Sequence, residues 1–297
     1  IQLKAGKYYH VEMLQKAGVG ADNCAMYWKR PSNATTTLIS GTYLARWQDC
    51  APSVTVRAAL QGPYNTATGL MSDGLRSNGL IPTTEPFTAL GFTQVGGSGA
   101  TVPAAMLTTT GPNAIVDWVL VEIRDRNTPA TIVATRSALL QRDGDVVGTD
   151  GYPRLLFPSL SSDNYFVSVR HRNHFGTMNS TAVPMNKYER GVDFTLGTTA
   201  TYGSNARVAM PLSRSALWAG NALRDNTLKY TGTSNDRDPI LSAIGGVVPT
   251  NTVTGYTLND VNMDGTVKYT GAGNDRDPIL SNIGGIVPTA TRQEQLP

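Results

Sequence analysis

The chain has 297 residues, a net charge of +3 and two cysteines. Its 40% of hydrophobic residues can fill packed cores, whereas only 16% are charged, which is typical of all-β extracellular modules with long loops. No dense run of Lys or Arg gives the electrostatic footprint of a nucleic-acid-binding protein. The most apolar stretch, residues 114–123, contains Asp117 and Glu122 and is shorter than the roughly 20 residues of a membrane span. We therefore expect a mainly β protein with no nucleic-acid partner and no membrane span.

Residues 1–50 form the first predicted unit. The sequence opens within a predicted strand, so we expect a fragment or a processed product. "KYYHVEML" alternates, a Gly-rich turn follows, and "NCAMYWKRP" and "LISGTYLARW" complete the unit. The pattern is carried by Leu3, Ala5, Gly6, Lys7, Tyr9, Val11, Glu12, Met26, Tyr27, Trp28, Ile39, Gly41, Tyr43 and Leu44. It resembles the C-terminal end of the protective-antigen-type β-sandwich of adhesins, lectins and glycosidases. The calcium- and sugar-binding aspartates of that family lie upstream, so the resemblance places no sugar site on this chain.

The two cysteines, Cys24 and Cys50, fall in this unit. In an exported protein they could pair and strengthen a small module, and we favour this disulfide because the rest of the chain has a secreted composition. The alternative is a pair of buried free thiols.

Residues 51–198 are predicted to form a β-sandwich. Residues 114–125 are apolar on both faces, as in a central strand that is covered on both sides. Asp143-Gly144 marks a hairpin turn, and residues 165–172 alternate as a strand does. Residues 69–92 are irregular, and we expect a surface excursion with a short helix.

The remaining residues, 199–297, contain a tandem repeat. The first copy, Lys229–Thr252, and the second copy, Lys268–Thr291, have 24 residues each and are identical at 19 positions, with an offset of 39 residues. Two copies suggest a pseudo-symmetric pair in which each covers the apolar face of the other.

Oxygen ligands at alternating positions precede the second copy. A calcium loop needs carboxylates or amides at positions one, three and five, a Gly at six and a backbone carbonyl at seven. Asp260, Asn262, Asp264, Gly265 and the Thr266 carbonyl meet these requirements in order. We therefore predict a calcium site in residues 260–266, which we call the second loop.

A calcium loop also needs a carboxylate at position twelve, which we call the distal ligand. Here position twelve is Gly271, and the nearest acids, Asp275 and Asp277, lie beyond an insertion. Asp277-Pro278 is predicted to be an N-cap followed by Pro at the first helical position, so Asp277 fits the distal role and Asp275 is the other candidate.

The first copy has a weaker version of the same loop, residues 221–227, which we call the first loop. At the 39-residue offset, Asn221 replaces the first aspartate, Leu223 replaces the amide, and Asp225 is kept. Asp236 and Asp238 correspond to the two distal candidates. Weak calcium binding and a purely structural loop are equally good interpretations.

The motif "DVNMDGTVKYTGAGNDRDPILSNIGGIVPT" and the ending "TRQEQLP" resemble dockerin-type calcium modules. More narrowly, they are similar to the tandem repeats that close large secreted proteins of Bacteroidota-type bacteria. The resemblance implies an adhesin- or haemagglutinin-like parent protein, export by type IX secretion and Ca²⁺ as the bound ion.

The pair His171 and His174 in "HRNH" suggests zinc, but a strand would point them to opposite sides, so we expect polar residues at a strand end.

No sequence motif of a hydrolase or metalloprotease occurs. We therefore expect a non-catalytic C-terminal region of a large secreted or cell-surface protein. Its partner would be the secretion or cell-surface machinery, or a surface glycan. The alternatives are an accessory region of a glycan-active enzyme and a subunit of an extracellular fibre.

Overall fold

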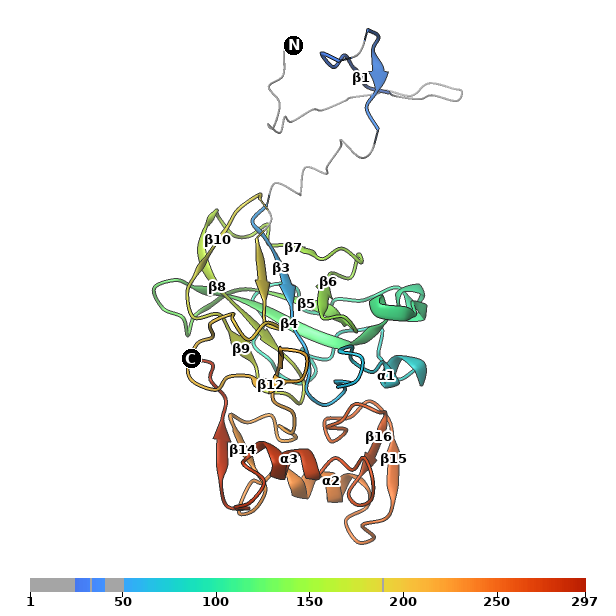
Figure 1. Ribbon diagram of the computed structural model, residues 1–297, viewed down its shortest axis with the longest axis vertical. Coiled ribbons are helices and arrows are strands. Elements are labelled where there is room, and N and C mark those ends of the chain that lie inside the picture. Colours follow the sequence, from blue (N-terminus) through green and yellow to red (C-terminus); the bar gives the residue numbers. More distant parts are fainter. Residues whose placement is uncertain (1–24, 33, 41–50, 189) are drawn as a thin grey trace. The chain divides into compact units, whose positions relative to one another are not determined.

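The computed structural model describes residues 25–32, 34–40, 51–188 and 190–297, and the chain divides into two compact units, Ile1–Cys50 and Ala51–Pro297 (Figure 1). In the first unit, the antiparallel strands β1 (Tyr27–Trp28) and β2 (Thr37–Leu38) form a small ladder. The strand expected at residues 7–14 and the pairing of Cys24 with Cys50 lie outside the described residues.

The second unit is built on a nine-stranded sheet. Seven of its strands follow the order β10-β8-β4-β5-β6-β3-β11, and the other two, β7 and β9, pair with β3 and β8. Neighbouring strands are antiparallel except the parallel pair β3 and β11. The mainly β class predicted from the sequence is confirmed. The strands are β3 (Ser53–Arg57), β4 (Ile115–Asp125), β5 (Ile132–Gln141), β6 (Asp145–Val147), β7 (Arg154–Leu156), β8 (Asp163–Arg170), β9 (Thr177–Met178), β10 (Val183–Met185) and β11 (Gly191–Asp193).

Strand β4 is the centre of this sheet. It pairs with β5 on one side and β8 on the other, and every residue from Ile115 to Arg124 is buried. This burial explains why its sequence is apolar on both faces, and it confirms the predicted central strand. Trp118 is fully buried, and its indole Nε1 donates to the Pro82 carbonyl at 2.9 Å.

The segment 69–92 is not a surface excursion. It does carry a short helix, α1 (Gly74–Ser77), but Leu75 and Phe87 are buried in the core of the sheet. The expectation was wrong about the location because several apolar side chains of the segment, Met71 and Ile81 among them, also pack into this core and fix an irregular segment on it. Two 3₁₀ helices, Ala104–Thr108 and Gly111–Asn113, follow before β4.

The tandem repeat folds as an interlocked pair. The first copy, together with the residues that flank it, forms β14 (Thr227–Lys229), α2 (Arg237–Ala243) and β15 (Thr252–Thr254). The second copy and its flanking residues form β16 (Thr266–Lys268), α3 (Asp277–Asn282) and β17 (Thr291–Gln293). Strand β14 pairs with β17, and β15 pairs with β16, so each ladder joins the two copies. The hairpin β12 (Val208–Met210) and β13 (Arg214–Ala216) precedes the repeat.

The two copies share one core, in which equivalent residues meet. Leu228 and Val267, Ile240 and Ile279, and Ile244 and Ile283 are all buried in it. The core also contains Phe175 and Ala219, which precede both loops in the chain. This arrangement agrees with the interpretation that the duplication exists because one loop and one short helix cannot enclose a core alone.

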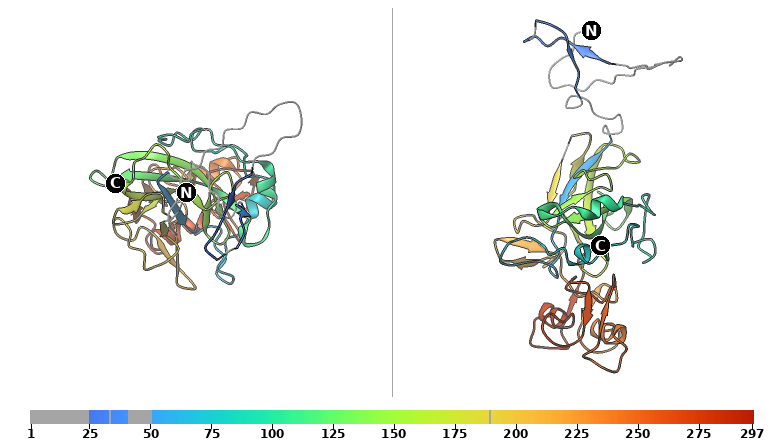
Figure 2. Two further views of the ribbon diagram at one scale, coloured as in Figure 1. Left: turned by 90° about the horizontal axis from the view of Figure 1, so that it is seen from above. Right: turned by 90° about the vertical axis from the view of Figure 1, so that its right-hand side faces the viewer.

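The residues expected as two modules, 51–198 and 199–297, belong to one compact unit. Met263 of the second loop is buried in the main core of the sheet. The chain end also returns to the sheet, where Glu294 accepts a hydrogen bond from the Gly176 amide at 2.6 Å and Arg124 donates to the Pro297 carbonyl at 3.2 Å. In Figures 1 and 2 the repeat elements nevertheless lie together at one end of this unit.

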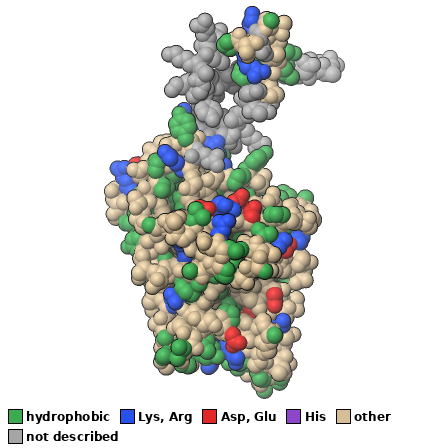
Figure 3. Space-filling model, viewed as in Figure 1, with side chains coloured by type: hydrophobic (Ala, Val, Ile, Leu, Met, Phe, Trp, Pro, Cys, Tyr) green, Lys and Arg blue, Asp and Glu red, His purple; other side chains and the backbone are tan. Residues whose placement is uncertain are grey.

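On the face shown in Figure 3, acidic and basic side chains lie near each other among uncharged ones instead of forming patches of one sign. No helix in the described part of the chain is both long and apolar enough to cross a membrane.

Candidate calcium loops and a buried polar network

The second loop folds back on its own side chains. The Asp260 carboxylate accepts hydrogen bonds from the amides of Asp264 at 3.2 Å and Gly265 at 2.9 Å. The Asn262 amide oxygen accepts from the Asp264 amide at 2.8 Å. Met263 and Gly265 have positive φ values of 62° and 90°, which produce the sharp turn that the Asn-x-Asp-Gly sequence predicts.

Asp275 closes this loop from the other side of the insertion. Its carboxylate accepts from the amides of Val261 at 2.7 Å, Asn262 at 3.2 Å and Lys268 at 2.8 Å. Asp275 and Asp260 are both fully buried. The pKa of Asp275 is raised to about 7 by burial and by the nearby Asp260 carboxylate, and the hydrogen bonds from the three amides oppose this shift. Burial likewise raises the pKa of Asp260 to about 6, although the positive charge of Arg172 favours the ionised carboxylate.

Asp277 lies apart from this group. Its side chain is 59% exposed, pairs with Arg276 at 3.0 Å and accepts from Asn274 at 2.8 Å. The hydrogen bond from Asn274 lowers the pKa of Asp277. Of the two candidates for the distal ligand, the structure places Asp275 against the loop and Asp277 on the surface.

Asp277 is also not the N-cap that the sequence suggested. Helix α3 begins at Asp277 itself, so Pro278 is its second residue. The Asn274 side chain accepts from the Asp277 amide at 2.9 Å and donates to the Asp277 carboxylate, a reciprocal exchange across three residues. Asn235 and Asp238 repeat it in the first copy. The spacing Asn-x-x-Asp was the signal for this exchange in the sequence.

Asp264 and Thr266 have other partners. The Asp264 carboxylate accepts from the Thr266 amide at 2.8 Å and lies 3.7 Å from the Lys268 ammonium, with 42% of the side chain exposed. Thr266 begins β16 and pairs with Thr254. Within the described residues, no three His, Cys, Asp or Glu side chains converge as a set of metal ligands.

Three residues at the second loop still offer side-chain oxygen atoms that suit calcium. Asp260, Asn262 and Asp275 offer the hard oxygen atoms that calcium takes from proteins. Asp275 is buried, and no ion pair to it forms within the described part of the chain. A buried carboxylate without a cationic partner has to be accompanied by a proton or a metal ion.

The first loop repeats half of this arrangement. Asp236 is fully buried and accepts from the amides of Leu223 at 3.1 Å and Lys229 at 2.9 Å, and burial raises its pKa to about 6. The buried Asn221 side-chain oxygen has no hydrogen-bond partner. Asp225 accepts from the Thr227 amide at 2.9 Å, as Asp264 does from Thr266. Asp238, like Asp277, is more than half exposed and pairs with its neighbouring arginine.

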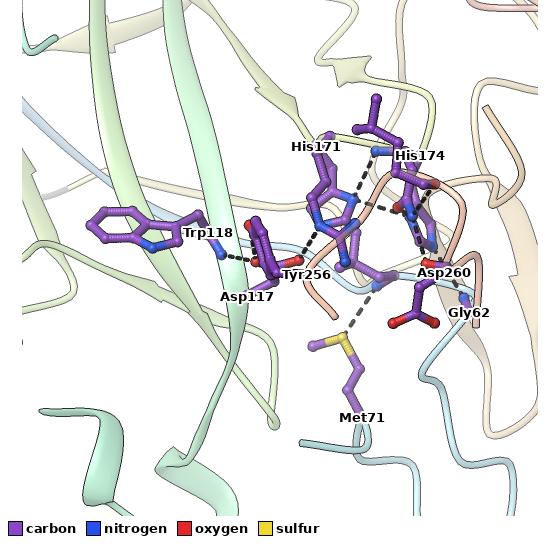
Figure 4. A network of polar contacts seen from close by, with 12 residues as sticks. Gly62, Met71, Asp117, Trp118, His171, His174, Tyr256 and Asp260 are labelled. Carbon is purple, nitrogen blue, oxygen red and sulfur yellow. Dashed lines mark hydrogen bonds and ion pairs between the residues drawn. The ribbon is translucent and has the colours of Figure 1, made fainter. Parts of the chain in front are cut away.

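A buried polar network lies between the sheet and the second loop (Figure 4). At its centre is Asp117 of β4, which bonds Arg172 at 2.8 Å, His171 at 3.1 Å and the Tyr256 hydroxyl at 2.6 Å. Arg172 stacks on the Tyr256 ring at 4.4 Å and donates to the Thr257 carbonyl. Burial opposes ionisation of Asp117, but the charge of Arg172 and the hydrogen bonds from His171 and Tyr256 lower its pKa to about 2.

His171 and His174 lie together in this network, which corrects the sequence-based expectation that they face opposite sides. Strand β8 ends at Arg170, so the alternation of a strand stops before the first histidine. The two rings meet edge to face with centroids 4.8 Å apart, and their Nδ1 atoms are 3.1 Å apart. Both side chains are buried and already hydrogen-bonded, so the pair is a part of the core and not an open zinc site.

Asn173, between the two histidines, contacts both loops. Its side-chain amide donates to the carbonyls of Leu258 at 3.0 Å and Asp260 at 2.7 Å. Its backbone carbonyl accepts from the amides of Gly220 at 3.2 Å and Asn221 at 3.1 Å. One fully buried residue thus fixes the beginning of both loops, although nothing in its local sequence indicated this role.

Comparison with known proteins adds no assignment, because no family model, no curated protein and no solved structure matches the chain.

Proposed function

We propose that this chain is the non-catalytic C-terminal region of a large secreted or cell-surface bacterial protein, and that calcium stabilises its tandem repeat. In this proposal the repeat is a dockerin-like module, and the nine-stranded sheet belongs to a β-sandwich. The region supports adhesion or docks the parent protein to the type IX secretion or cell-surface machinery. Its partner is a protein of that machinery or a surface glycan.

The observation that carries the calcium proposal is the pair of buried carboxylates Asp260 and Asp275. Burial raises the pKa of both carboxylates, and the charge of Asp260 also contributes to the raised pKa of Asp275. Both accept hydrogen bonds from backbone amides, which carry no full positive charge. Asp260, Asp275 and the Asn262 oxygen would hold the ion, with Asp264 and the Thr266 carbonyl as further candidates. Bound calcium would supply the positive charge that these carboxylates lack, and it would stabilise the folded chain by mass action.

The first loop is a second, weaker candidate. The unpartnered Asn221 oxygen and the buried Asp236 carboxylate support an ion there, whereas Leu223 offers no side-chain oxygen. Asp225 and Asp238 have the same partners as Asp264 and Asp277 of the second loop.

Calorimetric titration of the full chain with Ca²⁺ tests the proposal. We expect Asp275→Asn to lose the tightest binding event and Asp277→Asn to keep it, because only Asp275 faces the loop. The two variants remove the same charge from residues two positions apart, so they form a matched pair. Wild-type protein that binds no calcium, or equal loss in both variants, would contradict the assignment.

The other domains of the parent protein would distinguish a docking or adhesion role from a role as an accessory to an enzyme. Repetitive adhesin modules in the parent protein before Ile1 support the first, and a catalytic domain there supports the second. The purified chain itself is expected to hydrolyse neither polysaccharide nor peptide substrates, and reproducible turnover would contradict the non-catalytic assignment.

A further inference from the structure

The hydrogen bonds around His171 and His174 define which nitrogen of each ring carries the proton. The Gly62 amide donates to Nε2 of His174 at 3.1 Å, so the proton of this ring is on Nδ1. That Nδ1 faces Nδ1 of His171 at 3.1 Å and the Asn173 side-chain oxygen at 2.8 Å. Nδ1 of His171 also accepts a hydrogen bond from the backbone N–H of Asn173 at 3.4 Å. The proton of His171 is therefore on Nε2, which donates it to Asp117.

This arrangement has no position for a second proton on either ring. A proton on Nε2 of His174 would face the Gly62 N–H, and a proton on Nδ1 of His171 would face both His174 Nδ1–H and the Asn173 N–H. The charged and titratable groups around the pair are Asp117 from β4, Arg172 from the same turn, Tyr256 from the segment before the second loop, and Asp260 at the start of that loop. Arg172 adds a positive charge beside both rings, which further disfavours an imidazolium.

The two rings also hold the contacts that join the sheet to the repeat. His174 fixes the Gly62 backbone, against which the Val261 carbonyl lies so closely that a Cβ on Gly62 would come within 2.2 Å of it. The backbone of His174 forms a bridge with Ala219, and the next residue, Phe175, enters the core of the repeat. Asn173, between the histidines, bonds the beginnings of both loops. A movement of residues 171–174 would therefore loosen every one of these contacts.

We propose that His171 and His174 form an acid-sensitive lock, which holds the tandem repeat on the sheet while both rings are neutral and loosens it when they take up protons. Burial lowers the pKa of His174 well below its ordinary value, and it lowers that of His171 despite the opposing charge of Asp117. The folded chain therefore resists a protonation that the unfolded chain accepts near pH 6.5. The stability from the lock is complete above that pH and is lost as the pH falls below it. This inference does not depend on calcium binding.

Denaturant unfolding of the full chain between pH 7.5 and 5, in saturating calcium, tests the lock. For each histidine held neutral, we expect the folding equilibrium constant to fall by up to about tenfold per pH unit below pH 6.5. The variant with both His171→Gln and His174→Gln should lose this part of the pH dependence, and His10→Gln, which changes the third histidine of the chain, should keep it. An identical pH dependence in wild type and in the double variant would overturn the proposal.

Two further measurements on wild-type protein remain informative if the double variant does not fold. Nitrogen-15 spectra of the histidine rings at pH 7.5 should show the proton of His171 on Nε2 and that of His174 on Nδ1, and on acidification neither ring should titrate near its ordinary pH of about 6.5. A ring that titrates near pH 6.5 in the folded protein would refute the lock. Amide exchange at pH 5.5 should increase at residues 218–223 and 257–263 before it increases in β4. Equal increases at all three places would mean global unfolding and would also refute it.

Discussion

At the scale of single residues, Asp275 should control the pH dependence of calcium binding. Its pKa of about 7 in the folded chain lies above the ordinary value of 3.8. Without calcium, its contribution to stability is therefore complete below about pH 4 and is lost as the pH rises through 7. Because calcium needs the deprotonated carboxylate, we expect its affinity to fall by about tenfold per pH unit below pH 7, and more steeply below pH 6, where Asp260 also takes up a proton. Calorimetric titrations at pH 5.5, 6.5 and 7.5 measure this, and a constant affinity would contradict it.

Asn173 offers a second test at this scale. Asn173→Ala leaves the buried Asp260 carbonyl and the partly buried Leu258 carbonyl without their donor, and we expect it to lower the free energy of unfolding by about 2–4 kcal/mol. Asn164→Ala, at an exposed position of β8, is the control and should change it by less than about 0.5 kcal/mol. Similar denaturation midpoints for the two variants would show that Asn173 does not hold the loops.

The sequence predicted these residues unevenly. Asp260, Asn262 and Asp264 were found because loop ligands alternate within a few residues. Asp277 was preferred over Asp275 because of a predicted N-cap that the structure does not have, whereas two acids two positions apart satisfy the same spacing and only burial separates them. Asn173 and the histidine pair were missed as a cluster because their partners, Asp117, Gly62 and Asp260, are distant in the chain, and no Gly or Pro marks the end of β8 at Arg170.

At the scale of elements, the crossed ladders mean that neither copy of the repeat folds without the other. Ile240 of α2 and Ile279 of α3 are both fully buried in the shared core. We expect Ile240→Ala or Ile279→Ala to lower the free energy of unfolding by about 2–5 kcal/mol, because each leaves a cavity. Each variant should also increase amide exchange in both ladders, β14 with β17 and β15 with β16, and not only in its own copy.

The matched control is Ile286→Ala, in the second copy, whose side chain is 87% exposed. It removes the same atoms from the same type of residue and should change the free energy of unfolding by less than about 0.5 kcal/mol. Exchange that increases in only one ladder after Ile240→Ala would contradict the shared core. The short helices were predictable because a Pro marks the start and a Gly pair marks the end of each. The pairing of strands of one copy with strands of the other was not, since it joins residues far apart in the chain, such as Thr227 and Gln293.

At the scale of the whole molecule, the second unit should behave as one cooperative body, and residues 51–198 should not fold alone. The core of the sheet contains Leu217 and Met263, both almost fully buried and both contributed by the chain after residue 198. Removing one such side chain costs about 2–5 kcal/mol, and a whole domain is typically stable by only about 5–15 kcal/mol. Removal of residues 199–297 also deprives Asp117 of the Tyr256 hydroxyl and leaves Arg124 and Arg170 without the chain end.

We therefore expect residues 51–297 to unfold in a single urea transition that has the same midpoint by near-ultraviolet circular dichroism and by amide exchange in β4. Residues 51–198 should give no cooperative transition and no protected β4 amides. Calcium should shift the single transition of the longer chain as a whole, because the loop that holds Asp260 also places Met263 in the core of the sheet. Two separate transitions for residues 51–297, with only one of them sensitive to calcium, would contradict this coupling. They would restore the division at residue 198 that the sequence suggested, and the shared burial of Met263 would then contribute little to stability.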